Sequence, residues 1–155
     1  MSKDPIDIEV IGRGVLTWGD FILLCRNKAG GYTYLPGGHV EFGEPAAVAV
    51  AREFEEETGM EVRVGDCLLM HEHIFRQSGR LRHEINLVFH VEHGETAQAA
   101  STPPPVASRE KKISFGWCKR SELASSDLRP PVIAGWLTAV QVGDSPRPQW
   151  LSESS

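Results

Sequence analysis

The stretch that decides the fold runs from Gly38 to Met60 and reads GHVEFGEPAAVAVAREFEEETGM. It fills every position of the pattern G-x5-E-x7-R-E-U-x-E-E-x-G-U, in which U is a bulky apolar residue. Seven of these positions are fixed letters. At average residue usage, a chance match at a given start has a probability on the order of 10⁻⁸ to 10⁻⁹. The match is therefore a strong signal, and the rest of the chain can be interpreted around it.

The middle of this stretch predicts an amphipathic helix from about Pro45 to Thr58. Proline suits the first helical position, where no backbone donor is needed, and Gly59 suits the C-terminal stop. At about 100° per residue, one side of the helix is apolar and should face the core. That side consists of Ala47, Val50, Ala51 and Phe54.

Three carboxylates share another side of the same helix. Glu53, Glu56 and Glu57 stand at i, i+3 and i+4, so their charges repel one another. A bound hard cation would remove this cost, and oxygen ligands are those that Mg²⁺ or Mn²⁺ prefers. Ala46 and Ala49 precede them on the same side, and their small size should leave room for a polyphosphate.

Two glycines precede the helix. Gly37 and Gly38 follow a short predicted strand, and we expect them to form a strand-to-helix turn where backbone groups approach a ligand closely. The alternative is that the acidic run is only a solvated helix face, as most charge runs are. Because Glu44, Arg52 and Gly59 all stand in register with the run, we favour a metal-assisted attack of water on a phosphate anhydride.

The composition of the whole chain indicates a globular protein. Its 155 residues carry a formal net charge of −5, which argues against a general binder of nucleic-acid polymers. Its three cysteines are widely spaced and suit a reducing compartment. The N-terminal residues lack an apolar leader and no stretch is long enough to span a membrane, so we expect a cytoplasmic protein without a membrane partner.

Apolar and β-branched runs on both sides of the helix predict strands. We expect strands at residues 6–17, 21–25, 32–35, 60–64, 67–75, 81–91 and 113–118, and a second helix at 131–142. Residues 94–112 are poor in apolar residues, contain three consecutive prolines and predict a mobile loop. The expected organisation is one domain over residues 1–142, followed by a frayed C-terminal tail at 143–155.

The pattern at 38–60 resembles the signature of the Nudix hydrolase family, including its MutT-like members. This resemblance implies an α/β (α+β) fold, namely an αβα sandwich with a mixed β-sheet between helices. It also implies pyrophosphohydrolase activity with Mg²⁺ or Mn²⁺ on a nucleotide substrate, a nucleoside diphosphate linked to another moiety X. Many family members are dimers, so a homodimer is possible by analogy.

The resemblance also implies roles for individual residues. Glu53, Glu56 and Glu57 are similar to the family's metal ligands, to which the backbone carbonyl of Gly37 or Gly38 contributes. Glu53 is also similar to the residue that orients or deprotonates water in some members. Arg52 resembles the residue that positions a carboxylate of the signature by a charge-assisted hydrogen bond, and Glu44 resembles a supporting acidic residue.

A further catalytic glutamate often lies outside the family's signature. Glu110, on the loop before the last predicted strand, is our first candidate, and its alternative role is that of a solvated loop charge. Glu84 is our second candidate, and it could equally be a partly buried residue held by Arg82.

The substrate is constrained mainly by what the sequence lacks. The motifs that mark the family's ADP-ribose, dinucleoside-polyphosphate, NADH and coenzyme A members are not found, which leaves a nucleoside triphosphate or a nucleotide-sugar. Candidate substrate-binding residues are His39, Tyr34, Phe75 and Arg76. His71 and His73 share a strand face, but no third ligand has diagnostic spacing, so we assign them ordinary strand roles.

Two other functions remain as alternatives. A nucleotide-binding regulatory module on the same fold that has lost catalysis would more often have lost a ligand glutamate, and all three are present here. An isomerase acting on a prenyl diphosphate would need further catalytic residues that the sequence does not identify.

Overall fold

A computed structural model describes residues 7–93, 102–139 and 148–154 of the protein. The elements are, in chain order, β1 (Glu9–Trp18), β2 (Phe21–Asn27), β3 (Thr33–Tyr34), β4 (Gly37–His39), α1 (Ala46–Thr58), β5 (Val62–Gln77), β6 (Arg80–His93), β7 (Ile113–Lys119), the 3-10 helix η1 (Arg120–Ser125), α2 (Pro131–Ala139) and β8 (Gln149–Ser154).

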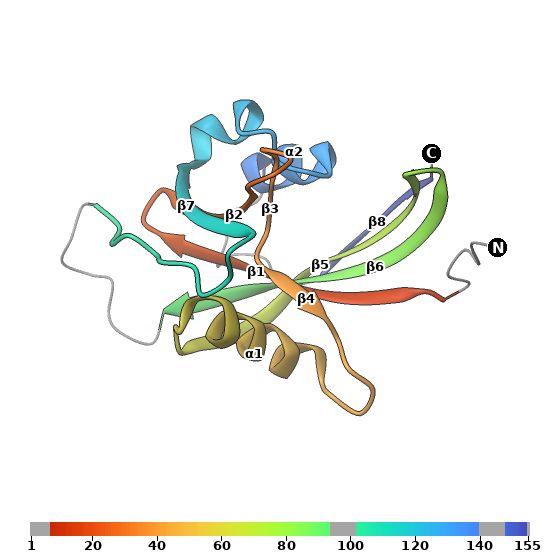
Figure 1. Cartoon of the computed structure of the whole chain (residues 1–155), viewed down its shortest axis with the longest axis horizontal. Coiled ribbons are helices and arrows are strands. Elements are labelled where there is room, and N and C mark those ends of the chain that lie inside the picture. The colour runs from red at the N-terminus through yellow and green to blue at the C-terminus, as the bar shows by residue number, and fades with distance from the viewer. Residues whose placement is uncertain (1–6, 94–101, 140–147, 155) are drawn as a thin grey trace.

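The strands of the described residues form one mixed sheet. Its order is β3-β2-β1-β6-β5-β8, with β4 paired to β1 and β7 paired to β2. The pairs β1–β6 and β5–β8 are parallel, and the other pairs are antiparallel. Helix α1 covers one face of the sheet, and η1 and α2 cover the other (Figure 1). The predicted αβα sandwich with a mixed sheet is therefore confirmed.

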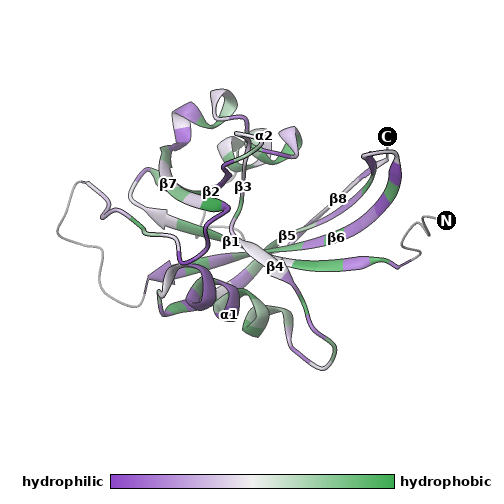
Figure 2. Cartoon of the chain, viewed as in Figure 1, coloured by the Kyte–Doolittle hydropathy of each residue, from purple (hydrophilic) through white to green (hydrophobic). Residues whose placement is uncertain are grey.

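Helix α1 packs on the sheet through a small apolar cluster. Val50 and Phe54 of α1 pack with Leu16, Leu23 and Val91 of the strands, and all five are buried. Gly12 and Gly14 of β1 permit this close approach, because added Cβ atoms there would lie 2.8 Å from Val50 and 2.6 Å from Phe54. Figure 2 shows that α1 is largely hydrophobic near its start and hydrophilic near its end, where the acidic run lies.

A larger core fills the opposite face of the sheet. Ile133 and Leu137 of α2 pack with Val15, Leu69 and Val88, one residue from each of three neighbouring strands. The strands β1 and β6 therefore lie between the two cores. These two central strands contribute residues to the cavity described below.

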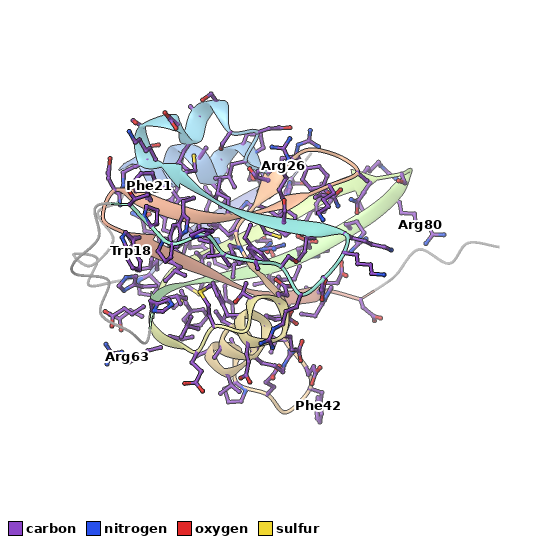
Figure 3. The ribbon with its side chains drawn as sticks, turned by 60° about the vertical axis from the view of Figure 1, so that its left-hand side comes forward. Trp18, Phe21, Arg26, Phe42, Arg63 and Arg80 are labelled. Carbon is purple, nitrogen blue, oxygen red and sulfur yellow. The ribbon has the colours of Figure 1, made fainter. Side chains whose placement is uncertain are left out.

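Three predicted features differ from the structure. The sequence predicts two strands around Gly65, but β5 is continuous, because bulges near Cys67 absorb the irregularity without ending the strand. Gly37 and Gly38 form the short strand β4 rather than a turn, and the chain reverses afterwards, at the exposed loop whose tip carries Phe42 (Figure 3). The predicted frayed tail contains β8, which pairs with the edge of β5 and satisfies backbone groups that an edge strand leaves open.

The predicted mobile loop at 94–112 is described only from residue 102 onward, and residues 94–101 lie outside the described part of the chain. From 102 the chain makes defined contacts: Val106 packs on the α1 core, and Trp117 Nε1 donates a hydrogen bond to the Pro104 carbonyl at 2.8 Å. The predicted second helix is observed over 131–139, and its last three residues are again outside the described part. None of the helices in the described residues is long and apolar enough to cross a membrane.

Candidate active site

Helix α1 presents the acidic run on its last turns. Pro45 precedes the helix with an extended backbone, and Gly59 ends it in the left-handed conformation that glycine favours, donating its N–H to the Glu55 carbonyl at 2.8 Å. The predicted room beside Ala49 is not present, because Ala49 is fully buried where α1 packs on the sheet.

Arg52 ties together the acidic groups at this end of the molecule. Its Nε and Nη2 donate to the two oxygens of Glu44 at 2.8 and 3.0 Å, a bidentate pairing. Its Nη1 donates to Glu53 Oε1 at 3.0 Å and to Glu56 Oε2 at 3.3 Å. These bonds, that with Glu44 above all, raise the pKa of Arg52 and keep it charged. Arg52 Nη2 also donates to the His39 carbonyl at 3.1 Å, so one guanidinium links the loop to the helix.

Glu57 is the buried member of the acidic run, with a relative exposure of 9%. Burial, and then the negative charges of Glu53 and Glu110, raise the pKa of Glu57 to about 8. A hydrogen bond between Glu57 and Glu53 contributes as well, and it requires a proton between the two carboxyl groups. The raised pKa therefore favours the protonated form of the Glu57 carboxyl group.

Gly38 lies directly against the carboxylate of Glu53. A Cβ added to Gly38 would stand 2.5 Å from Glu53 Cδ and 2.6 Å from Glu53 Oε1. Gly37 pairs with Arg13 of β1, and a Cβ there would collide with the Gly12 carbonyl. Both glycines are required because backbone and carboxylate share a space that has no room for another side chain.

Replacing Gly38 by alanine should therefore lower catalytic turnover by about 10–100-fold, because the new methyl displaces the Glu53 carboxylate from its position. Gly116→Ala is the matched control, since a Cβ there meets nothing within 4 Å. Steady-state kinetics of the two variants, with thermal melting to verify folding, checks this. Equal activity in both would show that the close contact at Gly38 has no functional role.

Glu110 reaches the same site from the segment before β7. The Arg109 N–H donates to the Glu57 carbonyl at 2.7 Å, which fixes this segment to the end of α1. The Glu110 N–H donates to Ser108 Oγ at 3.0 Å, and Ser108 Oγ donates to the Glu110 carbonyl at 2.8 Å. The negative charge of Glu110 contributes to the raised pKa of Glu57, and the Glu110 residue itself is exposed.

A cavity of about 460 Å³ opens on the α2 side of the sheet, which is within the usual size range of ligand pockets. It is lined by Arg13, Tyr32, Tyr34, His73, Phe75, Arg76, Gln77, Glu84, Arg129, Pro130 and Pro131. The Arg129 guanidinium lies 4.8 Å from the ring centre of Tyr32, and that of Arg13 lies 5.6 Å from the ring centre of Tyr34. The two tyrosine rings lie next to each other, with ring centres 6.0 Å apart, and each contacts one guanidinium.

Arg13 connects this cavity to the acidic site. Its Nε donates to Asn86 Oδ1 at 3.0 Å, and its Nη1 donates to the Leu35 carbonyl at 3.1 Å. Asn86 Nδ2 in turn donates to Glu84 Oε1 at 3.3 Å. The positive charge of Arg13 also acts on Glu57, where it lowers the pKa and so opposes the effect of burial. Arg13, which lines the cavity, therefore also influences a carboxylate of the acidic run through its charge.

The predicted substrate-binding residues separate into two groups. Tyr34, Phe75 and Arg76 line the cavity, as does Glu84. His39 does not line it; its side chain is 65% exposed, and its Nε2 lies 2.9 Å from Glu9 Oε1. Glu84 is held by Asn86 rather than by Arg82, which instead forms an ion pair with Glu9.

The family model described as NUDIX domain matches residues 10–137. The chain belongs to the Nudix family. This membership makes the protein a hydrolase of phosphoric anhydrides, and it confirms the resemblance carried by residues 38–60.

Solved structures share the Nudix fold at low sequence identity. A Nudix hydrolase from Nitrosomonas europaea is 15% identical with a TM-score of 0.70, covering 100% of this chain and 82% of that chain. A MutT protein from Bacillus halodurans is 18% identical with a TM-score of 0.65, covering 94% and 90%. The ORF135 protein of E. coli is 24% identical with a TM-score of 0.60, covering 89% and 96%. At these identities the similarity shows the fold alone.

The donor set of the Nudix helix fits a divalent cation. Glu53, Glu56 and Glu57 offer carboxylate oxygens, while Arg52 contacts only the first two of them. Burial and the neighbouring negative charges of Glu53 and Glu110 raise the pKa of Glu57. The β4 glycines leave the backbone accessible beside these groups. Oxygen ligands of this kind suit Mg²⁺ or Mn²⁺.

Sequence reasoning missed several residues that line the cavity of this Nudix chain. The sequence did contain an indication of Arg13, because a single arginine interrupts the apolar residues of β1. The sequence contained no such indication for Arg129 and Pro130, since only the loop before α2 brings them to the cavity. His73 appeared as a strand residue, and its position facing the cavity depends on the pairing of β5 with its neighbours.

Proposed function

We propose that this Nudix hydrolase uses Mg²⁺ or Mn²⁺ to cleave a nucleoside diphosphate linked to X, with a nucleoside triphosphate or a nucleotide-sugar as substrate. The observation that carries the proposal is the convergence of Glu53 and Glu57 with Glu110, which comes from a separate segment of the chain, beside the β4 glycines. Glu53 and Glu57 are largely buried, and burying two neighbouring carboxylates is costly unless a cation binds there.

Glu53, Glu56 and Glu57, with the carbonyl of Gly37 or Gly38, would hold the metal. When bound, the ion supplies charge neutralisation for the phosphate oxygens and makes water more acidic. Arg52 contributes orientation: its bonds to Glu44 and Glu53 fix the rotamer of Glu53, so that this carboxylate is positioned before substrate arrives.

The hydrolytic step needs a group that accepts a proton from water. In the proposed step, the water oxygen forms a new bond to phosphorus, the bridging P–O bond breaks, and the proton passes to a carboxylate. Glu53 is our first choice for this acceptor. Glu110 is the second, because it lies near Glu57 without a contact to Arg52 among the described residues.

The cavity would bind the nucleoside part of the substrate or X. Tyr32, Tyr34 and Phe75 provide ring faces for stacking, and Arg76 provides positive charge for a phosphate or a sugar hydroxyl. Glu84 accepts a hydrogen bond from Asn86 and retains acceptor capacity for a base N–H or a sugar O–H.

A substrate panel tests the proposal: nucleoside triphosphates, nucleotide-sugars, dinucleotides and ADP-ribose, each assayed with Mg²⁺ or Mn²⁺. Glu57→Gln is the inactive control, and Glu55→Gln, in the same run but exposed, is the active one. In ¹⁸O-labelled water, one product phosphate should gain label in a single turnover, which identifies the phosphorus attacked. If nucleotides bind but none is hydrolysed above the Glu57→Gln control, the chain is instead a nucleotide-binding module.

Cation binding should also change how stability depends on pH. The pKa of Glu57 is raised from 4.5 to about 8. Between these values the unfolded chain has already released the Glu57 proton, whereas the folded protein still holds it. The metal-free protein therefore loses stability as pH rises from 4.5 to about 8. We expect the increase in melting temperature caused by Mg²⁺ to grow between about pH 6 and about pH 9. Glu57→Gln should show a smaller, pH-independent increase. An equal pH trend in the variant would assign the trend to another group.

A further inference from the structure

Two histidines of β5 and one glutamate of β8 converge on the α2 side of the sheet. His71, His73 and Glu153 each present a ligand atom, and these atoms all lie within 4.8 Å of one another. His71 Nε2 lies 2.7 Å from Glu153 Oε1. The parallel register places Glu153 directly beside His73, while the alternation of β5 puts both imidazoles on one face.

Hydrogen bonding leaves this cluster incomplete. His71 is 1% exposed, and its Nδ1 is buried without a hydrogen-bond partner. His73 stacks between the His71 ring at 5.3 Å and the Phe75 ring at 4.3 Å, yet within the described residues its side chain makes no hydrogen bond. A histidine–glutamate pair alone would explain His71 and Glu153. It gives no reason for the second imidazole beside them.

Charged residues of both signs lie around the cluster, and Arg13 and Arg129 line the small cavity beside His71. Glu84 stands across from His73 in the β5–β6 register, so carboxylates flank the imidazoles on two neighbouring strands. His73 is partly buried beside these groups. His71 also lines a cavity of about 20 Å³, which has room for about one water to accept a bond from the imidazole N–H.

We propose that His71, His73 and Glu153 form a second divalent-cation site, selective for Zn²⁺ or a similar transition metal. Two imidazoles and one carboxylate are a donor set that Zn²⁺ prefers and Mg²⁺ does not. Because Glu153 belongs to β8 and the histidines to β5, the ion pins the C-terminal strand to the sheet. Since His73 also lines the 460 Å³ cavity, the site borders that cavity. The site does not depend on the proposed hydrolysis.

Zn²⁺ titration of the full chain by calorimetry, with excess Mg²⁺ to occupy the carboxylates of α1, tests this site. We expect one Zn²⁺ per chain, retained in Glu57→Gln and weakened at least about 100-fold in His73→Ala and in Glu153→Gln. His83→Ala is the matched control. His83 is also a histidine of this sheet, and it lies within hydrogen-bonding distance of the Glu72 carboxylate. Unlike His73, it has no second histidine beside it among the described residues. Zn²⁺ should also slow amide exchange in residues 149–154 of the parent chain but not of His73→Ala.

Variants of His73 and Glu153 keep the test independent of folding, because these two ligands are only partly buried whereas His71→Ala removes a fully buried side chain. Loss of Zn²⁺ binding in Glu57→Gln with retention in His73→Ala would place the ion on α1 and overturn the proposal. Equal weakening in His83→Ala would overturn it as well. Failure of the hydrolysis assays leaves the zinc result unaffected, so the two proposals can fail separately.

Discussion

Replacing Glu53 by glutamine is expected to reduce kcat roughly 10²–10⁴-fold, the range associated with loss of a positioned acid or base. Glutamine keeps the size of the side chain and can still accept the bond from Arg52 Nη1, which is 3.0 Å long in the structure. It removes the charge that would hold a cation and accept a proton from water. Binding of the nucleoside or X in the separate cavity should be retained, so KM should change much less than kcat.

Glu55→Gln is the control for this prediction, because Glu55 belongs to the same acidic run but is exposed. It changes the net charge by the same amount, and its turnover should stay within about twofold of the parent protein, as surface changes usually do. Steady-state kinetics at saturating Mg²⁺ separates the two variants. A similar loss in both would mean that general negative charge, rather than the position of Glu53, supports the reaction.

Replacing Phe54 by alanine is expected to lower the free energy of unfolding by about 3–5 kcal/mol, as for other large aromatic residues of a core. Phe54 is 1% exposed and anchors α1 in the cluster with Leu16, Leu23 and Val91. Its ring lies where a side chain on Gly14 would otherwise stand. Because Gly14 has no side chain to fill the space that the ring leaves, a cavity should remain and the helix should lose its fixed position over the strands.

Val48→Ala provides the comparison, since Val48 lies on the same helix with 53% exposure. Its cost should be below about 0.5 kcal/mol. Denaturant unfolding of both variants without metal gives the two values. A cost under about 1 kcal/mol for Phe54→Ala would contradict the role of this ring as the anchor of α1.

The helix and its apolar face were predictable because they depend on neighbours along the chain. Val50 and Phe54 recur at helical spacing, and Gly59 allows the left-handed conformation that ends the helix. The same local periodicity failed at Ala49, which it placed on the open side of the helix. Ala49 is buried because the helix packs on the sheet over a wider arc than its apolar stripe indicates.

The partners of these residues were less predictable. Glu110 was a candidate only by analogy, and its place near Glu57 depends on a backbone bond from Arg109 that joins distant segments. His71 and His73 gave no metal signal, because Glu153 lies in a stretch that resembles a frayed tail. The catalytic roles of Glu44, Arg52 and Glu84 remain predictions, and the variants above address the roles of Glu53 and Glu57.

The sequence by itself determined the family, the acidic helix and the reaction class, because the spacing of residues 38–60 is specific and helical periodicity places their carboxylates together. Only the tertiary structure decided what surrounds them: the close contact of Gly38 with Glu53, the cavity next to Arg13, and the meeting of β8 with β5. The physical reason is the range of the interactions. Helix geometry acts over a few residues, whereas strand pairing joins residues such as His71 and Glu153 that local sequence cannot relate.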